Sequence, residues 1–441
     1  MSTWWCEHAW LGGDTVRAAV AVTVDDGIIT DVRADSPRTG KVLRGLVIPG
    51  LANAHSHAFH RALRARTQRG RGSFWTWRDV MYDAAARLTP DLYRELARAV
   101  YAEMTLAGIT AVGEFHYLHH DADGRPYADR NAMGHALIDA AGAAGLRMTL
   151  LDTCYLRAGL DDAPLEAGPR RRFGDGDAAS WAERVDALQA PDNVSVGAAI
   201  HSVRAVPPAA MAEVAGWARR RGTPLHIHSS EQATEVDQCL AVYGRTPTAL
   251  MRDHGVLGSG TTAVHATHLT DGDIVDLTAS GTGVCFCPTT ERDLGDGIGP
   301  APALIDGPFS LGSDSHAVID LFEEARAVEL DERLNRRERG LFTASRLLEC
   351  ASADGHRALG WPDAGTLRPG ARADLVALDV ASVRTAGGGA TVENAVFACT
   401  AADVTDVVID GRPVVVDREH RTVPDTGAAL AAAIAALLED R

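Results

Sequence analysis

The chain has 441 residues, of which 46% are hydrophobic and 23% are charged, a composition typical of a globular protein with a large core. Its formal net charge of −16 has the wrong sign for neutralising phosphates and argues against nucleic acid as a partner. No stretch reaches the roughly 18–20 consecutive apolar residues that span a bilayer, and the first residues lack the pattern of a secretory signal. The seven scattered cysteines favour reduced thiols. We therefore predict a cytoplasmic protein that binds neither nucleic acid nor membrane.

Both ends of the chain have the pattern of short β-strands. Asp25-Asp26-Gly27 lies between β-branched residues, which is typical of a hairpin turn, and residues 407–416 form a similar pattern around Asp410-Gly411. These segments predict one small β-sandwich domain built from residues 1–48 and 365–441. Its Ala-rich tail, 428–438, is too short to span a membrane and is predicted to be a docked C-terminal helix.

The middle of the chain, residues 49–364, alternates apolar runs with segments of helical period, such as 90–107 and 208–221. This alternation predicts parallel βα units, and its length fits a (β/α)8 barrel of TIM-like architecture. Cys285 and Cys287 belong to an apolar run and are predicted to be packed in a buried strand. The other predicted strands include 109–113, 147–151, 194–200, 224–227, 261–264 and 309–312.

Polar residues follow several of these apolar runs directly. His55 and His57 end the run 46–54, and because side chains alternate along a strand, the two imidazoles point the same way. A barrel directs all of its strand ends toward one axis, so these residues are expected to meet there and to bind a divalent transition metal. The further candidates at strand ends are His226, His228, Glu231, His265 and Asp314.

This order of residues resembles that of the amidohydrolase superfamily, whose metal-dependent deaminases carry it on a (β/α)8 barrel. The resemblance implies a metal held by His55, His57, His228 and Asp314, with Glu231, His265 and Asp314 carrying the proton transfers. His226 lies two residues before His228 and faces the same way, so it remains open as the ligand. Lys41, the only lysine, precedes the barrel, which leaves no lysine to bridge two metals. We therefore expect one ion per chain, Zn2+ or alternatively Fe2+.

Further segments resemble one branch of that superfamily, the formimidoylglutamate deiminases of histidine degradation. The segments that carry this likeness are 53–62, 73–82 with its Phe-Trp-x-Trp-Arg-Asp-x-Met-Tyr pattern, 113–120, 201–204 and 264–268. The resemblance implies a substrate with a formimino group and two carboxylates, bound by Arg78, Tyr117, His201 and Arg204. Guanidinium groups suit such an anion in a chain of negative net charge.

His60 stands where many members of this branch have glutamine, and it is retained as a substrate-binding candidate. His116, His119 and His120 are interpreted as part of a solvated loop around Tyr117. We also expect a homodimer acting on a small anionic substrate. The alternatives are a deaminase of a neutral heterocycle, an imidazolonepropionase, and a metal-free scaffold on the same barrel; the retained ligands argue against the scaffold.

Overall fold

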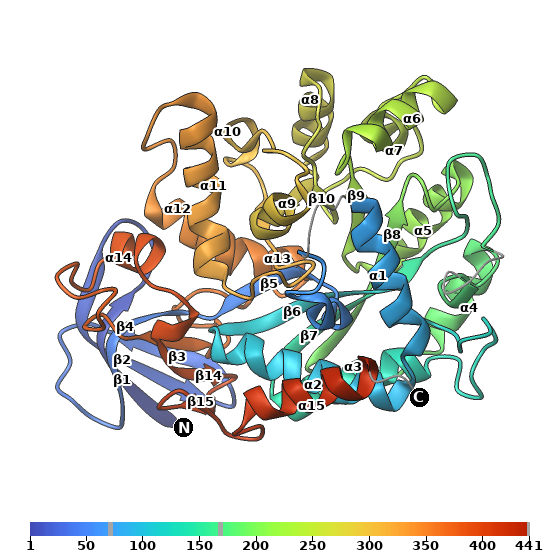
Figure 1. The fold of residues 1–441 in the computed structure, drawn as a ribbon. Coiled ribbons are helices and arrows are strands. Elements are labelled where there is room, and N and C mark those ends of the chain that lie inside the picture. The colour runs from blue at the N-terminus through green and yellow to red at the C-terminus, as the bar shows by residue number, and fades with distance from the viewer. Residues whose placement is uncertain (69–73, 166–170, 439–441) are drawn as a thin grey trace.

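The computed structural model describes residues 1–68, 74–165 and 171–438, and a barrel of eight parallel strands forms the centre of this part of the chain (Figure 1). Each strand pairs with the next in chain order, and a parallel bridge between Ser56 and Asp314 joins the last strand end to the first. The predicted barrel is therefore confirmed. Its strands are β5 (Leu51–Ser56), β6 (Ile109–His116), β7 (Arg147–Cys154), β8 (Val194–Ser202), β9 (Leu225–Ser229), β10 (Thr261–His265), β11 (Gly283–Phe286) and β12 (Phe309–Leu311).

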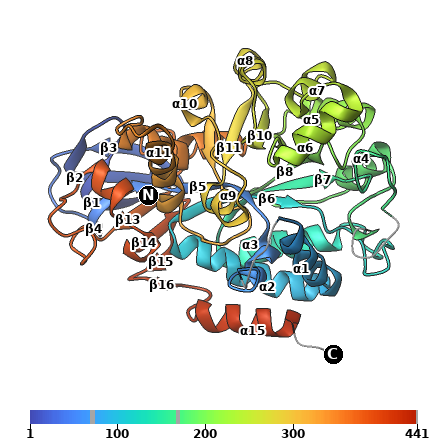
Figure 2. The same cartoon turned by 45° about the horizontal axis from the view of Figure 1, so that its top comes forward.

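Helices connect these strands and surround the barrel (Figure 2). The first group comprises α1 (Phe74–Arg87), α2 (Pro90–Leu106), α3 (Ala132–Ala144), α4 (Ala178–Asp186), α5 (Pro208–Arg221), α6 (Ala233–Tyr243) and α7 (Pro247–Asp253). The second group comprises α8 (Asp271–Ser280), α9 (Pro288–Leu294), α10 (Ala301–Leu304), α11 (Leu321–Arg336), α12 (Ala344–Glu349) and α13 (Gly355–Ala358).

Local sequence signals explain where these helices begin and end. In α2, the Thr89 side chain accepts a hydrogen bond from the Leu92 amide and Pro90 takes the first turn, where its missing N–H is not needed. The helix α5 likewise starts on Pro208 and ends at Gly222, whose φ of +63° is a left-handed C-cap. Both helices have the limits that the sequence predicted to within one residue.

The two chain ends together form a second, mixed sheet of eight strands, which confirms the predicted β-domain (Figure 1). The turns at Asp26-Gly27 and Asp410-Gly411 have positive φ at both residues, as the hairpin prediction requires. Lys41 lies here, as the first residue of β4, and not on a barrel strand. The strands are β1 (Ser2–Trp10), β2 (Val16–Asp25), β3 (Ile28–Arg33), β4 (Lys41–Pro49), β13 (Leu375–Leu378), β14 (Val404–Ile409), β15 (Arg412–Val416) and β16 (Glu419–His420).

A buried ion pair joins the barrel to this sheet. The Arg147 guanidinium, at the start of β7, contacts Asp374 at 2.6 Å and Asp410 at 2.6 Å, and neither Arg147 nor Asp374 is exposed by more than 1%. Two further short helices are η1 (Ala58–Leu63), which follows β5, and α14 (Val392–Phe397), which lies between β13 and β14 in the chain. The division into domains at residues 48 and 364 remains a prediction.

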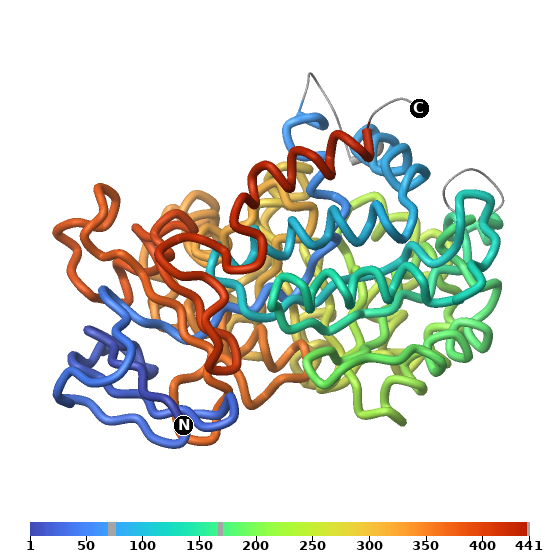
Figure 3. Tube along the Cα trace, turned by 90° about the horizontal axis from the view of Figure 1, so that it is seen from below, coloured from blue at the N-terminus to red at the C-terminus, as the bar shows by residue number. Residues whose placement is uncertain are grey.

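The C-terminal helix α15 (Thr426–Leu438) lies along the outside of α2 (Figure 3). Its buried residues are Thr426, Leu430, Ile434 and Leu437, which recur at helical spacing. The prediction of a docked helix is therefore confirmed. Among the described residues, no helix combines the length and the apolar character that a membrane crossing requires.

Candidate active site

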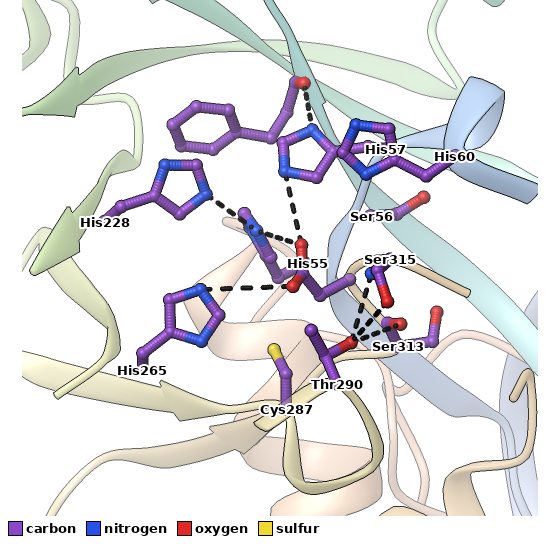
Figure 4. Close-up of polar contacts among 12 residues, drawn as sticks. His55, Ser56, His57, His60, His228, His265, Cys287, Thr290, Ser313 and Ser315 are labelled. Carbon is purple, nitrogen blue, oxygen red and sulfur yellow. Dashed lines mark hydrogen bonds and ion pairs between the residues drawn. The ribbon is translucent and has the colours of Figure 1, made fainter. Parts of the chain in front are cut away.

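Histidine and aspartate side chains from four strand ends converge at one end of the barrel (Figure 4). Asp314 Oδ1 lies 3.2 Å from His55 Nε2 and 3.3 Å from His57 Nε2. His228 Nε2 lies 3.0 Å from His55 Nε2, and His265 Nε2 lies 4.0 Å from Asp314 Oδ2. The structure thus brings together five of the six residues for which the sequence predicted metal binding or catalysis beside the metal, and the sixth, Glu231, lies next to His265.

The hydrogen bonds of the outer ring nitrogens direct lone pairs into this cluster. His57 Nδ1 lies 2.9 Å from the Phe115 carbonyl oxygen, and His228 Nδ1 lies 2.8 Å from that of His201. A carbonyl only accepts, so each Nδ1 donates a proton and each Nε2 is left to present a lone pair within the cluster. Burial lowers the pKa of His55 to about 3, which keeps this ring neutral as well. Three imidazoles and one carboxylate are a donor set that fits a zinc-like ion.

His265 and Glu231 lie next to each other beside this cluster. Glu231 Oε1 lies 3.9 Å from His265 Nε2, and His265 Nδ1 lies 3.4 Å from Glu291 Oε1. Burial opposes a charge on His265, but Glu231, Glu291 and Asp314 outweigh it and hold the pKa of His265 well above its ordinary value. These contacts suit an imidazole that donates a hydrogen bond from Nε2 beside a carboxylate able to move a proton.

Close backbone approach explains how Asp314 reaches the two histidines of β5. A Cβ atom on Gly312 would lie 2.7 Å from His55 Cβ and 2.8 Å from the His55 carbonyl oxygen, so only glycine fits there. Asp314 and His265 have positive φ, +39° and +70°, which is uncommon for residues with side chains. Strained backbone at two ends of the barrel's strands is typical of functional sites.

The structure distinguishes His226 from His228, the two histidines of β9 between which the sequence could not choose a metal ligand. His226 Nε2 lies 3.0 Å from the Ala358 carbonyl oxygen, in α13, whereas His228 lies in the metal-binding cluster. Both side chains point to the same side of β9, but they occupy different layers of the barrel interior. His228 is therefore the histidine positioned to bind a metal.

A cavity of about 450 Å³ opens onto the cluster. It is lined by all five substrate-binding candidates, namely His60, Arg78, Tyr117, His201 and Arg204. Its walls also carry the aromatic side chains of Trp77, Tyr82, Tyr155 and Phe173. Ser73, which opens the predicted tryptophan-rich segment, lies outside the described residues, and the side chains of Phe74 and Trp75 are likewise not described.

The cationic and hydroxyl groups of this cavity are held by neighbouring side chains. Arg204 Nη2 lies 3.6 Å from Glu231 Oε2, and Arg204 Nε lies 3.9 Å from Glu235 Oε1. Tyr117 Oη lies 2.9 Å from His60 Nε2. The cavity thus combines a guanidinium group shared between two carboxylates with a tyrosine hydroxyl paired to an imidazole.

The interpretation of His116, His119 and His120 as a solvated loop is wrong, because all three are at least 96% buried. His119 Nε2 lies 2.9 Å from the Thr153 carbonyl oxygen, and His120 Nε2 lies 3.1 Å from that of Gly174. Asp152, the carboxylate beside His116 and His119, is held by Arg184 through contacts of 2.8 and 2.9 Å. This arginine already neutralises the carboxylate, so the cluster is a poor metal site. Cys285 and Cys287 are buried free thiols, and Cys285 lies on β11 as predicted, whereas Cys287 follows that strand as the N-cap of α9.

Sequence reasoning missed Glu235 and Glu291, which contact Arg204 and His265 respectively. Glu235 lies in the first turn of α6, four residues after Glu231, which precedes the helix, so proximity in sequence was the only signal for it. Glu291 lies on α9, which follows β11 in the chain, and no local sequence pattern connects it with His265.

Comparisons with known proteins agree with this arrangement. Residues 46–414 match the model of the amidohydrolase family. The formimidoylglutamate deiminase of Pseudomonas aeruginosa is 38% identical over 438 residues, which cover 95% of this chain and 96% of that protein. The 5-methylthioadenosine/S-adenosylhomocysteine deaminase of Natronomonas pharaonis is 29% identical, with 87% and 84% covered.

Two solved structures extend the comparison to the fold. An amidohydrolase from Brucella melitensis superposes with a TM-score of 0.92 at 32% identity, with 100% of both chains covered. An adenosine deaminase from Xanthomonas campestris with bound zinc superposes with a TM-score of 0.83 at 25% identity, with 98% of this chain and 96% of that chain covered.

Proposed function

This chain belongs to the amidohydrolase family, and from that premise we propose that it hydrolyses N-formimino-L-glutamate to N-formyl-L-glutamate and ammonia in histidine degradation. The observation that carries the proposal is the cavity in which two arginines, Arg78 and Arg204, accompany the histidine and aspartate cluster. A substrate with two carboxylates and a hydrolysable formimino group needs both features. The 38% identity to a formimidoylglutamate deiminase supports the same substrate.

The residues that would hold the metal are His55, His57, His228 and Asp314, and one ion per chain is proposed, Zn2+ or alternatively Fe2+. Such an ion, when bound, lowers the pKa of a water molecule toward neutrality and so supplies a hydroxide nucleophile. The directed Nε2 lone pairs and the buried carboxylate support this assignment.

The side chains around the metal site divide the proton transfers among themselves. Asp314 accepts a proton from the attacking water, and its Oδ1 lies beside the proposed metal ligands, 3.2 Å from His55 Nε2 and 3.3 Å from His57 Nε2. His265 donates a hydrogen bond to the oxygen as it bonds to the formimino carbon. Glu231 gives its proton to the imino nitrogen, takes the hydroxyl proton of the tetrahedral intermediate and passes it to the leaving amine. The C–N bond then breaks, ammonia departs, the carbonyl of the formyl group forms, and the proton held by Asp314 returns to Glu231. Proton transfers of this kind contribute roughly 10²–10⁴-fold each.

The substrate's two carboxylates would bind Arg78 and Arg204, with Tyr117 and His201 lining the same cavity and His60 as a further contact. Arg204 lines the cavity and lies 3.6 Å from Glu231, so it can hold one carboxylate while remaining beside the acid–base group. We further propose a homodimer that acts in the cytoplasm, with the barrel at residues 49–364. The seven free cysteines support a reducing compartment.

The test is ammonia release by the purified protein, together with elemental analysis. Formiminoglutamate should give the highest kcat/KM, and a neutral N-alkylformamidine without carboxylates should be a poor substrate. Metal content should be close to one equivalent per chain. A preference for adenosine or for a neutral heterocycle would reject the dicarboxylate substrate, and two tightly held equivalents would reject the single-metal site.

A further inference from the structure

A chain of buried polar side chains lies behind the metal-binding cluster, away from the cavity. We call it the Glu114 network, and its members are Asn53, Ser56, Glu114, Ser313 and His316. All five are fully buried. The cavity lining, over the part of the chain that the structure describes, includes none of them. The proposed reaction leaves the network without a role.

The hydrogen bonds of this network run in one direction. When Glu114 is ionised, Ser56 Oγ donates to Glu114 Oε2 at 2.7 Å, because a carboxylate only accepts. Ser56 Oγ therefore accepts from His316 Nε2 at 3.1 Å, and His316 Nδ1 accepts from Ser313 Oγ at 2.9 Å. Ser313 Oγ in turn accepts from the Asn53 side-chain amide at 2.7 Å. Each of these donors therefore has an acceptor within the network. His316 carries its proton on Nε2, because Nε2 donates to Ser56 and Nδ1 accepts from Ser313.

These residues hold the backbone on both sides of the proposed metal ligands. Ser56 lies between His55 and His57, and the amide of Ala58, immediately after His57, donates to Glu114 Oε1 at 2.7 Å. On the opposite strand end, Ser313 precedes Asp314, and its amide donates to the Asn53 side-chain oxygen at 2.9 Å.

The same region carries unusual backbone geometry. His316 and Asp314 both have positive φ, +57° and +39°. Backbone hydrogen bonds join the two strand ends directly, from the Asp314 amide to the His55 carbonyl at 3.0 Å and from the His57 amide to the Asp314 carbonyl at 3.3 Å. Such conformations persist only where surrounding contacts over-determine them. The Glu114 network supplies contacts of that kind.

We propose that the Glu114 network is a positioning device that sets His55, His57 and Asp314 in their binding geometry before the metal arrives. The inference rests on the proposed metal ligands. It gives the network's residues a role in raising metal affinity and no role in contacting the substrate. Removal of a member leaves the ligands in place but allows the two strand ends to shift, so metal affinity falls. Outer-shell partners of metal ligands typically contribute 10–100-fold to affinity.

The test compares Ser56→Ala with a matched control, Ser310→Ala. Ser310 is also buried in the barrel, and its Oγ donates one hydrogen bond, to the Val284 carbonyl at 3.1 Å, but it touches no member of the network by any hydrogen bond that the described residues form. Zinc affinity is measured by competition with a chromogenic chelator. We expect Ser56→Ala to raise the Kd for zinc at least about tenfold, and Ser310→Ala to leave it at the wild-type value.

A second variant and a melting-temperature measurement keep the inference testable if Ser56→Ala folds poorly. Glu114→Gln retains the size of the side chain but places an amide donor against Ser56 or Ala58, so it should weaken zinc binding as well, even if Ser56→Ala folds poorly. Melting temperatures with and without zinc separate positioning from general stability: Ser56→Ala should lose part of the increase caused by zinc, whereas a merely structural role would lower both temperatures equally. Equal zinc affinity in wild type, Ser56→Ala and Glu114→Gln would overturn the inference. Failure of the wild-type protein to bind zinc would instead reject the proposed metal ligands.

Discussion

Arg204 offers the sharpest test of the proposed dicarboxylate substrate. Replacing it with methionine retains much of its volume and removes the guanidinium group. A hydrogen bond between charged groups is worth about 1.5–3 kcal/mol, so kcat/KM for formiminoglutamate should fall about 10- to 150-fold. The neutral N-alkylformamidine has no carboxylate to lose, so its low kcat/KM should change little.

Arg204→Met also has an electrostatic effect on a neighbouring carboxylate, and the experiment must separate this effect from the loss of substrate binding. Glu235 is 99% buried, and burial raises its pKa while Arg204 opposes that rise. Arg204→Met therefore leaves Glu235 without that counter-charge, at a cost of order 4 kcal/mol for a pair near 4 Å at an effective dielectric constant of 20. Protonation of Glu235 relieves most of this cost, so the variant should still fold.

Glu235→Gln is the matched control, because it neutralises the carboxylate and retains the guanidinium group. Ammonia release is followed with both substrates for wild type, Arg204→Met and Glu235→Gln. The reasoning predicts a selective loss on formiminoglutamate in Arg204→Met and a smaller loss in Glu235→Gln. Equal losses on both substrates in Arg204→Met would refute it, since Arg204 would then act through Glu231 and not on a carboxylate of the substrate.

Three other predictions follow from particular contacts. Glu231→Gln should retain its metal by elemental analysis and lose roughly 10²–10⁴-fold in kcat, because glutamine cannot carry a proton; near-normal turnover would make Glu231 structural. Arg147→Met should lower the free energy of unfolding in denaturant by about 3–5 kcal/mol, because it leaves Asp374 buried without its partner; an unchanged midpoint would contradict this. Burial raises the pKa of Glu114 from 4.5 to about 7, so between these pH values the folded state binds more protons than the unfolded state, and this group's contribution to stability falls as pH rises. The stability of metal-free wild type relative to Glu114→Gln should therefore fall by up to about 3 kcal/mol from pH 4.5 to 7, and a pH-independent difference would refute this assignment.

Local patterns in the sequence determined the architecture and the position of the site along the chain. The alternation of apolar runs with helical segments predicted the barrel, and the Asp26-Gly27 and Asp410-Gly411 turns predicted the hairpins of the second sheet. His55 and His57 were predictable as a pair because side chains two residues apart share a face of a strand. Such signals depend on residues a few positions apart, so they can be read before the chain folds.

Tertiary structure alone decided which polar residues meet. His226 and His228 point to the same side of β9 but lie at different depths in the barrel. His226 therefore contacts the Ala358 carbonyl, whereas His228 joins the metal-binding cluster. Glu114 and His316 are far apart in sequence and become linked through Ser56 only when the first and last strands of the barrel close. The physical reason is that burial and hydrogen-bond partners are set by strands brought together over the whole length of the barrel, and no short segment of the chain contains that information.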